Sequence, residues 1–142
     1  MTLTEHQIWL VQTSFEKFIV DIDVAAKVFY SHLFESQPSL MPLFKGDTRV
    51  QGRKLITMIL FIVNGLDDVD SLLPQIRLLG DSHAGYGVQP QDYSTMLEAL
   101  IATLKQTLGR EFTPETEAAW RGVYTLMAET AIESGFAHRP IG

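Results

Sequence analysis

Apolar residues recur at spacings of three and four along almost the whole chain, which is the period of an amphipathic α-helix. Proline, glycine and acidic residues separate these segments, and such residues commonly begin or end helices. Because strand-like alternation is absent, the pattern predicts an all-α chain of six longer helices with one or two short helical turns. The expected helices cover residues 4–19, 21–36, 48–66, 70–83, 90–108 and 114–135.

Local signals mark several of these boundaries. Thr4 and Gln7 have the spacing of a capping box, in which each side chain bonds the other residue's backbone N–H. Pro90 stands where one helix is expected to begin, and Gly109 stands at its end in the C-cap role. Thr113-Pro114 provides a cap and a first residue for the last helix.

The composition is that of an ordinary globular domain, with 46% hydrophobic and 20% charged residues. A net charge of −6 with scattered basic residues argues against nucleic-acid binding, which needs clustered lysine and arginine. The longest apolar run, Met58–Val63, is too short for membrane insertion. Cysteine is absent, which excludes disulfides and thiolate metal sites and is compatible with a reducing compartment. We therefore expect one cytoplasmic domain over residues 1–142, with a flexible tail from about 136.

His83 is the strongest candidate for a functional residue. Leu79, Ile76 and Leu72 precede it by four, seven and eleven residues, and these spacings share one face of a helix. The imidazole is therefore expected to face the interior, where its ring nitrogens need partners. A metal ion is one such partner and a backbone carbonyl is another, and the residues of this stretch leave both open.

Several segments occur together in an order that is typical of one protein family: Leu43-Phe44, Gln51–Leu55, Leu79–His83, Gly87-Val88 and Trp120–Tyr124. In order and spacing they resemble the corner phenylalanine, the distal segment, the proximal segment and the start of the last helix of globins. The resemblance covers nearly the whole chain. Bacterial single-domain haemoglobins, flavohaemoglobin haem domains and neuroglobin are the members that it resembles most.

This resemblance implies a globin fold around a haem pocket, with haem b as the cofactor and His83 as the iron ligand. It also implies that Phe44 packs on the haem plane and that Leu55 lies over the iron. The further haem contacts that it implies are Leu79, Val88, Tyr93, Met96 and Lys54. For Lys54 and its neighbour Arg53, contact with the haem propionates or the pocket mouth and a solvated helix face are equal alternatives.

Gln51 and Tyr30 are the expected distal groups. Gln51 takes the place where many globins carry histidine, and its amide N–H can donate to bound O₂. Because an amide is a poor iron ligand beside imidazole, this glutamine argues against a haem held by two histidines. Tyr30 matches a tyrosine of bacterial globins, whose phenol would be a second donor. Without the resemblance, a solvated Gln51 and a core Tyr30 bonded to a carbonyl are the alternatives.

Tyr93 follows His83 by ten residues and matches a tyrosine that flavohaemoglobin-type domains use beside the proximal histidine. Those domains add a glutamate from the last helix, which makes the imidazole a stronger electron donor. The matching position here is Gly135, with Glu133 two residues away and Glu129 more than a turn away. We therefore expect at most weak peroxidase activity.

The function that the resemblance implies is reversible binding of O₂ and of other diatomic gases such as CO and NO, as in oxygen binding or transport. A further expected role is that of a nitric oxide dioxygenase, which oxidises nitric oxide to nitrate. Oxidation and peroxidase chemistry need an electron source, and 142 residues leave no room for a flavin domain, so we expect a separate reductase. The alternatives are a haem-based gas or redox sensor and a helical interaction module without haem.

Overall fold

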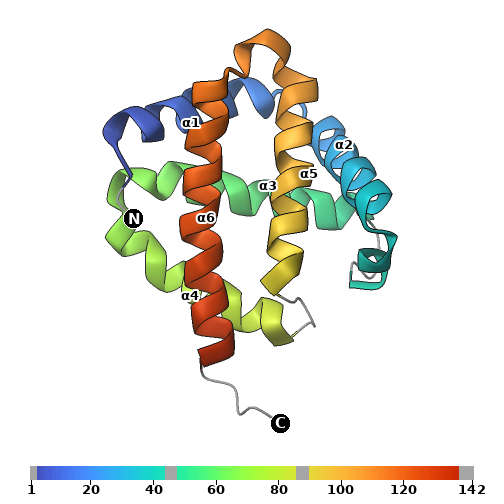
Figure 1. Cartoon of the computed structure of the whole chain (residues 1–142), viewed down its shortest axis with the longest axis vertical. Coiled ribbons are helices and arrows are strands. Elements are labelled where there is room, and N and C mark those ends of the chain that lie inside the picture. Colours follow the sequence, from blue (N-terminus) through green and yellow to red (C-terminus); the bar gives the residue numbers. More distant parts are fainter. Residues whose placement is uncertain (1–2, 44–47, 86–89, 138–142) are drawn as a thin grey trace.

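Six α-helices and three short 3₁₀ turns form the part of the chain that the computed structural model describes, residues 3–43, 48–85 and 90–137 (Figure 1). Side chains are described for residues 3–39, 41–42, 50–78 and 91–131. The absence of strands from these ranges confirms the all-α prediction, with one turn more than expected. In chain order the elements are α1 (Glu5–Phe18), α2 (Ile22–Ser36), η1 (Pro38–Leu43), α3 (Thr48–Gly65), η2 (Leu66–Asp68), α4 (Val69–Gly85), α5 (Pro90–Leu108), η3 (Gly109–Glu111) and α6 (Pro114–Ala137).

The predicted caps are present. The backbone N–H of Gln7 donates to Thr4 Oγ1 at 3.0 Å, and the backbone N–H of Thr4 donates to Gln7 Oε1 at 2.9 Å. At the start of α6, Thr113 Oγ1 accepts from the backbone N–H of Thr116 at 3.1 Å. Gly109, which follows α5, has a φ of 57°, the left-handed conformation that glycine adopts at helix ends.

Helix α4 begins and ends differently from the prediction. It starts at Val69, directly after turn η2, and it continues to Gly85 instead of ending at His83. The early start has a local cause, because the Asp68 carboxylate accepts from Ser71 Oγ at 2.7 Å and from the Ser71 backbone N–H at 3.4 Å. His83 therefore lies inside a helix.

Helix α6 runs alongside α5, and α1 and α4 pack on α6 from behind in the view of Figure 1. Helix α2 packs on both α5 and α3. Inside the core, Trp120 Nε1 of α6 donates to Ser14 Oγ of α1 at 2.8 Å, which satisfies a buried indole N–H. The core is mainly apolar, although it also buries Thr103, whose hydroxyl donates to the Ala99 carbonyl at 2.7 Å. Its fully buried large apolar side chains include Phe15, Phe18, Leu33, Ile56, Leu66 and Leu104.

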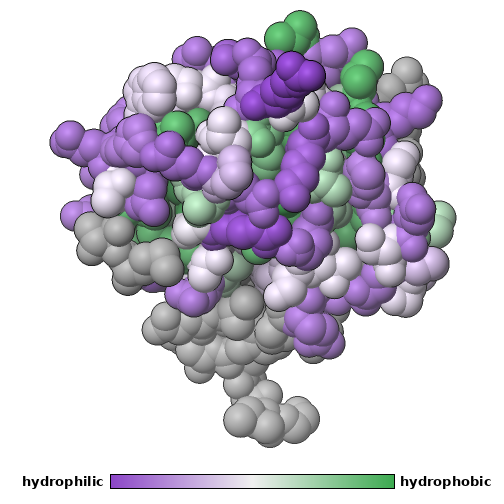
Figure 2. Space-filling model, turned by 45° about the horizontal axis from the view of Figure 1, so that its top comes forward, coloured by the Kyte–Doolittle hydropathy of each residue, from purple (hydrophilic) through white to green (hydrophobic). Residues whose placement is uncertain are grey.

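The surface carries separate apolar side chains on a mainly hydrophilic background, as the face in Figure 2 shows. Val20, Leu78 and Trp9 are examples, with 87%, 63% and 57% of their area exposed. Single exposed apolar residues are normal for globular proteins. Within the described part of the chain, no helix is both long enough and apolar enough to cross a membrane.

Helices α2 and α3 cross in close contact at Gly52. A Cβ atom at this position would lie 2.5 Å from Ala26 Cβ and 3.3 Å from Tyr30 Cε2. Because carbon atoms in contact stay about 3.5–4.0 Å apart, no larger side chain fits here unless a helix moves. Beside the crossing, the Arg53 guanidinium donates to both carboxylate oxygens of Asp23, at 2.9 and 3.0 Å. Close backbone packing and a surface ion pair together fix this crossing.

Replacing Gly52 by alanine is expected to lower the free energy of unfolding by about 1–3 kcal/mol, since the added methyl group overpacks the crossing. Urea unfolding measures the change. Gly122→Ala in α6 is the matched control, because its Cβ would meet only Gln7 Nε2 at 3.9 Å, an ordinary contact. This control should be neutral or stabilising by up to ~1 kcal/mol, as alanine favours helix. Equal effects of the two substitutions would contradict the close crossing.

Candidate functional site

The apolar stripe of α4 faces the core as predicted. Leu72 and Ile76 are 3% and 2% exposed. By their spacing, Leu79 and His83 continue the same face of the helix, about one and two turns after Ile76. Their side chains lie outside those that the structure describes. The helix that carries His83 is therefore confirmed, and the iron ligand stays a prediction.

Tyr30 is a buried polar side chain of α2. It is 7% exposed, its ring stacks on Phe34 with centroids 5.5 Å apart, and it meets Phe29 edge-on. The ring also lies against α3 at Gly52. Burial raises the pKa of Tyr30 to about 12, because the charged phenolate would lose its hydration. The hydroxyl is therefore neutral and keeps its proton at physiological pH.

Gln51 and Leu55 lie one turn apart on α3, and both are half-buried. Leu55 packs against the apolar core. Gln51 directly precedes Gly52, so the crossing brings the Tyr30 ring to the same end of α3 as the Gln51 amide. An amide offers N–H donors and a phenol offers an O–H donor. The two residues predicted to be distal are thus close along α3, and their chemistry suits a small ligand with partial negative charge.

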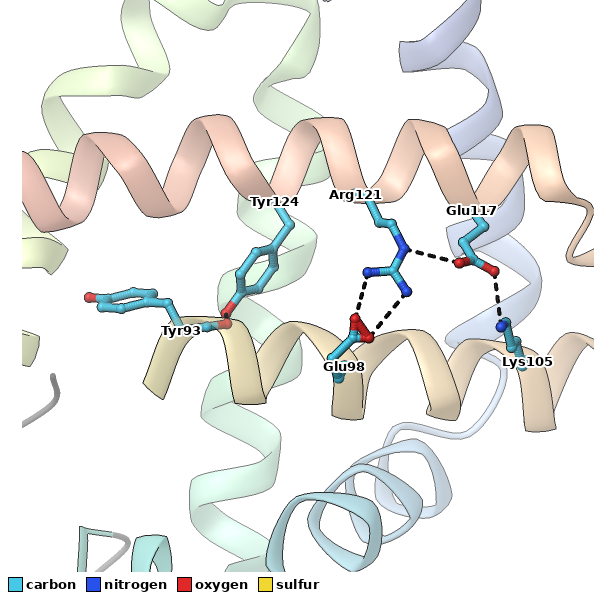
Figure 3. Close-up of polar contacts among 6 residues, drawn as sticks. All are labelled: Tyr93, Glu98, Lys105, Glu117, Arg121 and Tyr124. Carbon is cyan, nitrogen blue, oxygen red and sulfur yellow. Dashed lines mark hydrogen bonds and ion pairs between the residues drawn. The ribbon is translucent and has the colours of Figure 1, made fainter. Parts of the chain in front are cut away.

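Tyr93 and Met96 occupy the first two turns of α5, and both are half-buried. The Tyr124 hydroxyl of α6 donates to the Tyr93 backbone carbonyl at 2.8 Å (Figure 3). Burial raises the pKa of both phenols, and the neighbouring Tyr93 raises that of Tyr124 further. This contact was not predicted from the sequence. A hydroxyl on the apolar stripe of the last helix was the available signal, because a buried phenol needs a partner.

An ionic cluster joins α5 to α6 further along the same helices (Figure 3). Arg121 donates to both carboxylate oxygens of Glu98, at 2.6 and 3.1 Å, and to Glu117 at 3.0 Å, while Lys105 approaches Glu117 at 3.1 Å. The hydrogen bonds from Arg121 lower the pKa of Glu98, and those from Lys105 and Arg121 lower that of Glu117. Such exposed pairs add little stability. The bidentate pair of Arg121 with Glu98 nevertheless orients α5 relative to α6. Because Tyr93 lies on α5, this pair also helps to position Tyr93.

Lys54 and Arg53 are exposed neighbours on α3 with different surroundings. The guanidinium of Arg53 is bound to Asp23 of α2, as described above, so this ion pair is the contact observed for it. Lys54 makes no ion pair with any other side chain that the structure describes. It lines a solvent-open hollow of about 590 Å³ on α3.

Phe44 and Val88, predicted as haem contacts, lie outside the described residues. Helix α6 continues to Ala137, so Gly135 is helical, and the flexible tail stays a prediction. Residues 138–142 also lie outside the description.

The donor set suits an iron that is held by one protein side chain. Among the described residues, no group of three His, Cys, Asp or Glu side chains could hold a metal ion. A haem supplies its own equatorial nitrogens and needs a single axial donor from the protein. The phenol and the amide near the α2–α3 crossing, together with the apolar core around them, fit that group, and the imidazole of His83 on α4 is the predicted axial donor.

The chain is similar to flavohemoproteins and to a neuroglobin. It is 26% identical to the flavohemoprotein of Halalkalibacterium halodurans over 114 residues, which are 78% of this chain and 28% of that protein. It is 28% identical to neuroglobin-1 of Oncorhynchus mykiss over an alignment of 149 positions, which covers 95% of this chain and 93% of that protein. The chain thus spans about a quarter of the length of the flavohemoproteins that it matches.

A solved structure with a similar fold is that of an engineered carbene transferase, a variant of a putative nitric oxide dioxygenase from Rhodothermus marinus. The two share 28% sequence identity and superpose with a TM-score of 0.83 over 94% of each chain. The sequence model of the family described as Globin matches residues 27–131, from α2 to α6. Because this match covers well over half of the chain, the protein belongs to the globin family, and this membership implies a haem cofactor.

Proposed function

We propose that this globin binds O₂ reversibly at a haem b whose iron is held by His83, and that CO and NO bind at the same position. The observation that carries the proposal is the α2–α3 crossing, which brings a buried phenol and a half-buried amide to one end of α3. Hydrogen-bond donors in an apolar pocket retain O₂, because its outer oxygen carries partial negative charge when it is bound.

Each residue has its own task in this proposal. His83 coordinates the iron, and a carbonyl one turn earlier, near Leu79, holds the proton of its other ring nitrogen. Gln51 and Tyr30 donate hydrogen bonds to O₂, and Leu55 limits access to it. The remaining contacts with the haem are Phe44, Val88, Tyr93, Met96 and, at a propionate, Lys54.

The second part of the proposal is the oxidation of nitric oxide to nitrate. One NO, one O₂ and one electron give one nitrate ion, and a separate cytoplasmic reductase supplies the electron. Two donors slow the escape of O₂, which suits its reaction with NO better than bulk O₂ delivery. The structural similarity to a protein described as a putative nitric oxide dioxygenase supports this part.

Replacing Gln51 by leucine should raise the O₂ dissociation rate about tenfold, because one hydrogen bond of about 1–1.5 kcal/mol is lost. Stopped-flow measurements on haem-loaded protein give the rate. Gln106→Leu is the matched control, since Gln106 is exposed on α5, where its side chain hydrogen-bonds His32 of α2. Equal rates in the Gln51 variant and the wild type would contradict the distal role. A reconstituted protein without a Soret band would overturn haem binding itself.

The raised pKa of Tyr30, about 12, predicts how O₂ retention depends on pH. Below this value the phenol stays protonated and keeps donating, so the O₂ dissociation rate should be flat between pH 7 and about pH 10. Tyr30→Phe should release O₂ faster throughout this range, with the same flat profile. A rise in the rate near pH 9, present in the wild type and absent from Tyr30→Phe, would show that the phenol is not shielded from water.

Oxygenated protein mixed with nitric oxide should consume it faster than the spontaneous oxidation of NO in buffer. Nitrate should form in a one-to-one ratio with the NO consumed, and a chemical reductant should restore the protein for further cycles. An NO electrode and nitrate analysis measure both quantities. Consumption at the buffer rate would remove the dioxygenase role while leaving reversible O₂ binding intact.

A further inference from the structure

The exposed flank of α3 carries a hollow of about 590 Å³, which we call the α3 hollow. Pockets for small molecules typically measure about 300–1,000 Å³. The lining residues of α3 recur at spacings of three and four, so their side chains share one face of the helix. One further lining residue comes from α4. The lining residues are Val50, Arg53, Lys54, Thr57, Met58, Phe61 and Gln75.

The α3 hollow is distinct from the surface that carries the distal residues. At about 100° per residue, the face through Val50 and Phe61 lies roughly 100° around the helix from the face through Gln51 and Leu55. Neither Gln51 nor Leu55 lines the hollow. The hollow would therefore be accessible beside a bound haem.

The chemistry of the α3 hollow combines exposed apolar area with positive charge. Phe61 and Val50 are 50% and 48% exposed, although both are large apolar residues. The lining contains two cations and no acidic residue, on a chain with 17 acidic and 11 basic residues. Asp23 neutralises Arg53 from outside the lining, which leaves the ammonium of Lys54 without an ion pair among the described side chains.

We propose that the α3 hollow binds a free long-chain carboxylate, with its head group at Lys54 and its hydrocarbon chain along Met58 and Phe61. Lys54 and Phe61 are seven residues apart, about 10 Å along a helix, so only a long chain reaches both. Hydrocarbon burial supplies the affinity, and the lysine selects an anion over a cation. The proposal does not depend on O₂ binding.

Titration calorimetry of the haem-loaded protein with dodecanoate tests this proposal, with butyrate and dodecyltrimethylammonium as comparison ligands. Dodecanoate should bind with one-to-one stoichiometry and leave the Soret band unchanged, while the short acid and the cation should not bind detectably. Thr57→Glu, which puts a carboxylate into the hollow, should weaken dodecanoate binding about tenfold or more. Thr107→Glu is the matched control, because Thr107 is also exposed, lies on α5 and does not line the hollow, and the substitution changes the net charge identically.

Several outcomes would overturn the proposal. One is the absence of dodecanoate binding, and another is equal binding by Thr57→Glu and the wild type. Equal binding of the cationic ligand would show that Lys54 selects nothing. A shifted Soret band would place the carboxylate in the haem cavity and not on the flank of α3. A protein that never takes up haem but still binds dodecanoate would contradict the proposed O₂ function and leave this inference standing.

Discussion

The contact between Gly52 and Ala26 is the constraint on which the packing of α2 against α3, and with it the proposed distal site, depends. It lets α2 and α3 approach until the Tyr30 ring touches α3 beside Gln51. A single added methyl group would separate the helices and move the Tyr30 ring away from α3. Overpacking lowers the free energy of unfolding by about 1–3 kcal/mol, and a domain whose free energy of unfolding is about 5–15 kcal/mol stays folded after such a loss. A displacement of about 1 Å costs function far more than it costs the fold.

Polar contacts join α5 to α6, where the α2–α3 crossing relies on close backbone packing. The Tyr124 hydroxyl donates to the Tyr93 carbonyl, and Arg121 donates to both carboxylate oxygens of Glu98, about one and a half turns later on α5. A buried phenol without a partner would be costly, so the Tyr124 bond also defines where α5 must lie on α6. The two helix pairs thus differ in tolerance. Any residue larger than glycine at position 52 overpacks the crossing. Each exposed ion pair between α5 and α6, in contrast, can be removed with a small effect on stability.

Helical periodicity and end signals predicted most of the fold. Pro90 and Thr113-Pro114 begin helices where expected, and the stripe through Ile76 is buried. Periodicity says which face of a helix turns inward, but it does not say which residue of another helix it meets. The bonds from Arg53 to Asp23 and from Tyr124 to Tyr93 span 30 and 31 residues, so no local pattern contains them. A lone glycine inside a long helix does not by itself mark a close approach, because Gly122 in α6 makes only an ordinary contact where Gly52 lies at a helix crossing.

Lys54 lies at the border of two surfaces, because it is both the expected propionate contact and a lining residue of the α3 hollow. One ammonium cannot be the full partner of two carboxylates at once. A long-chain acid in the hollow would therefore weaken the hold on a propionate, and by linkage haem would weaken the acid by the same factor. Substitution of Lys54 would change both equilibria and could not separate them. Thr57 lines only the hollow, so its variant is the one that reports on the hollow alone.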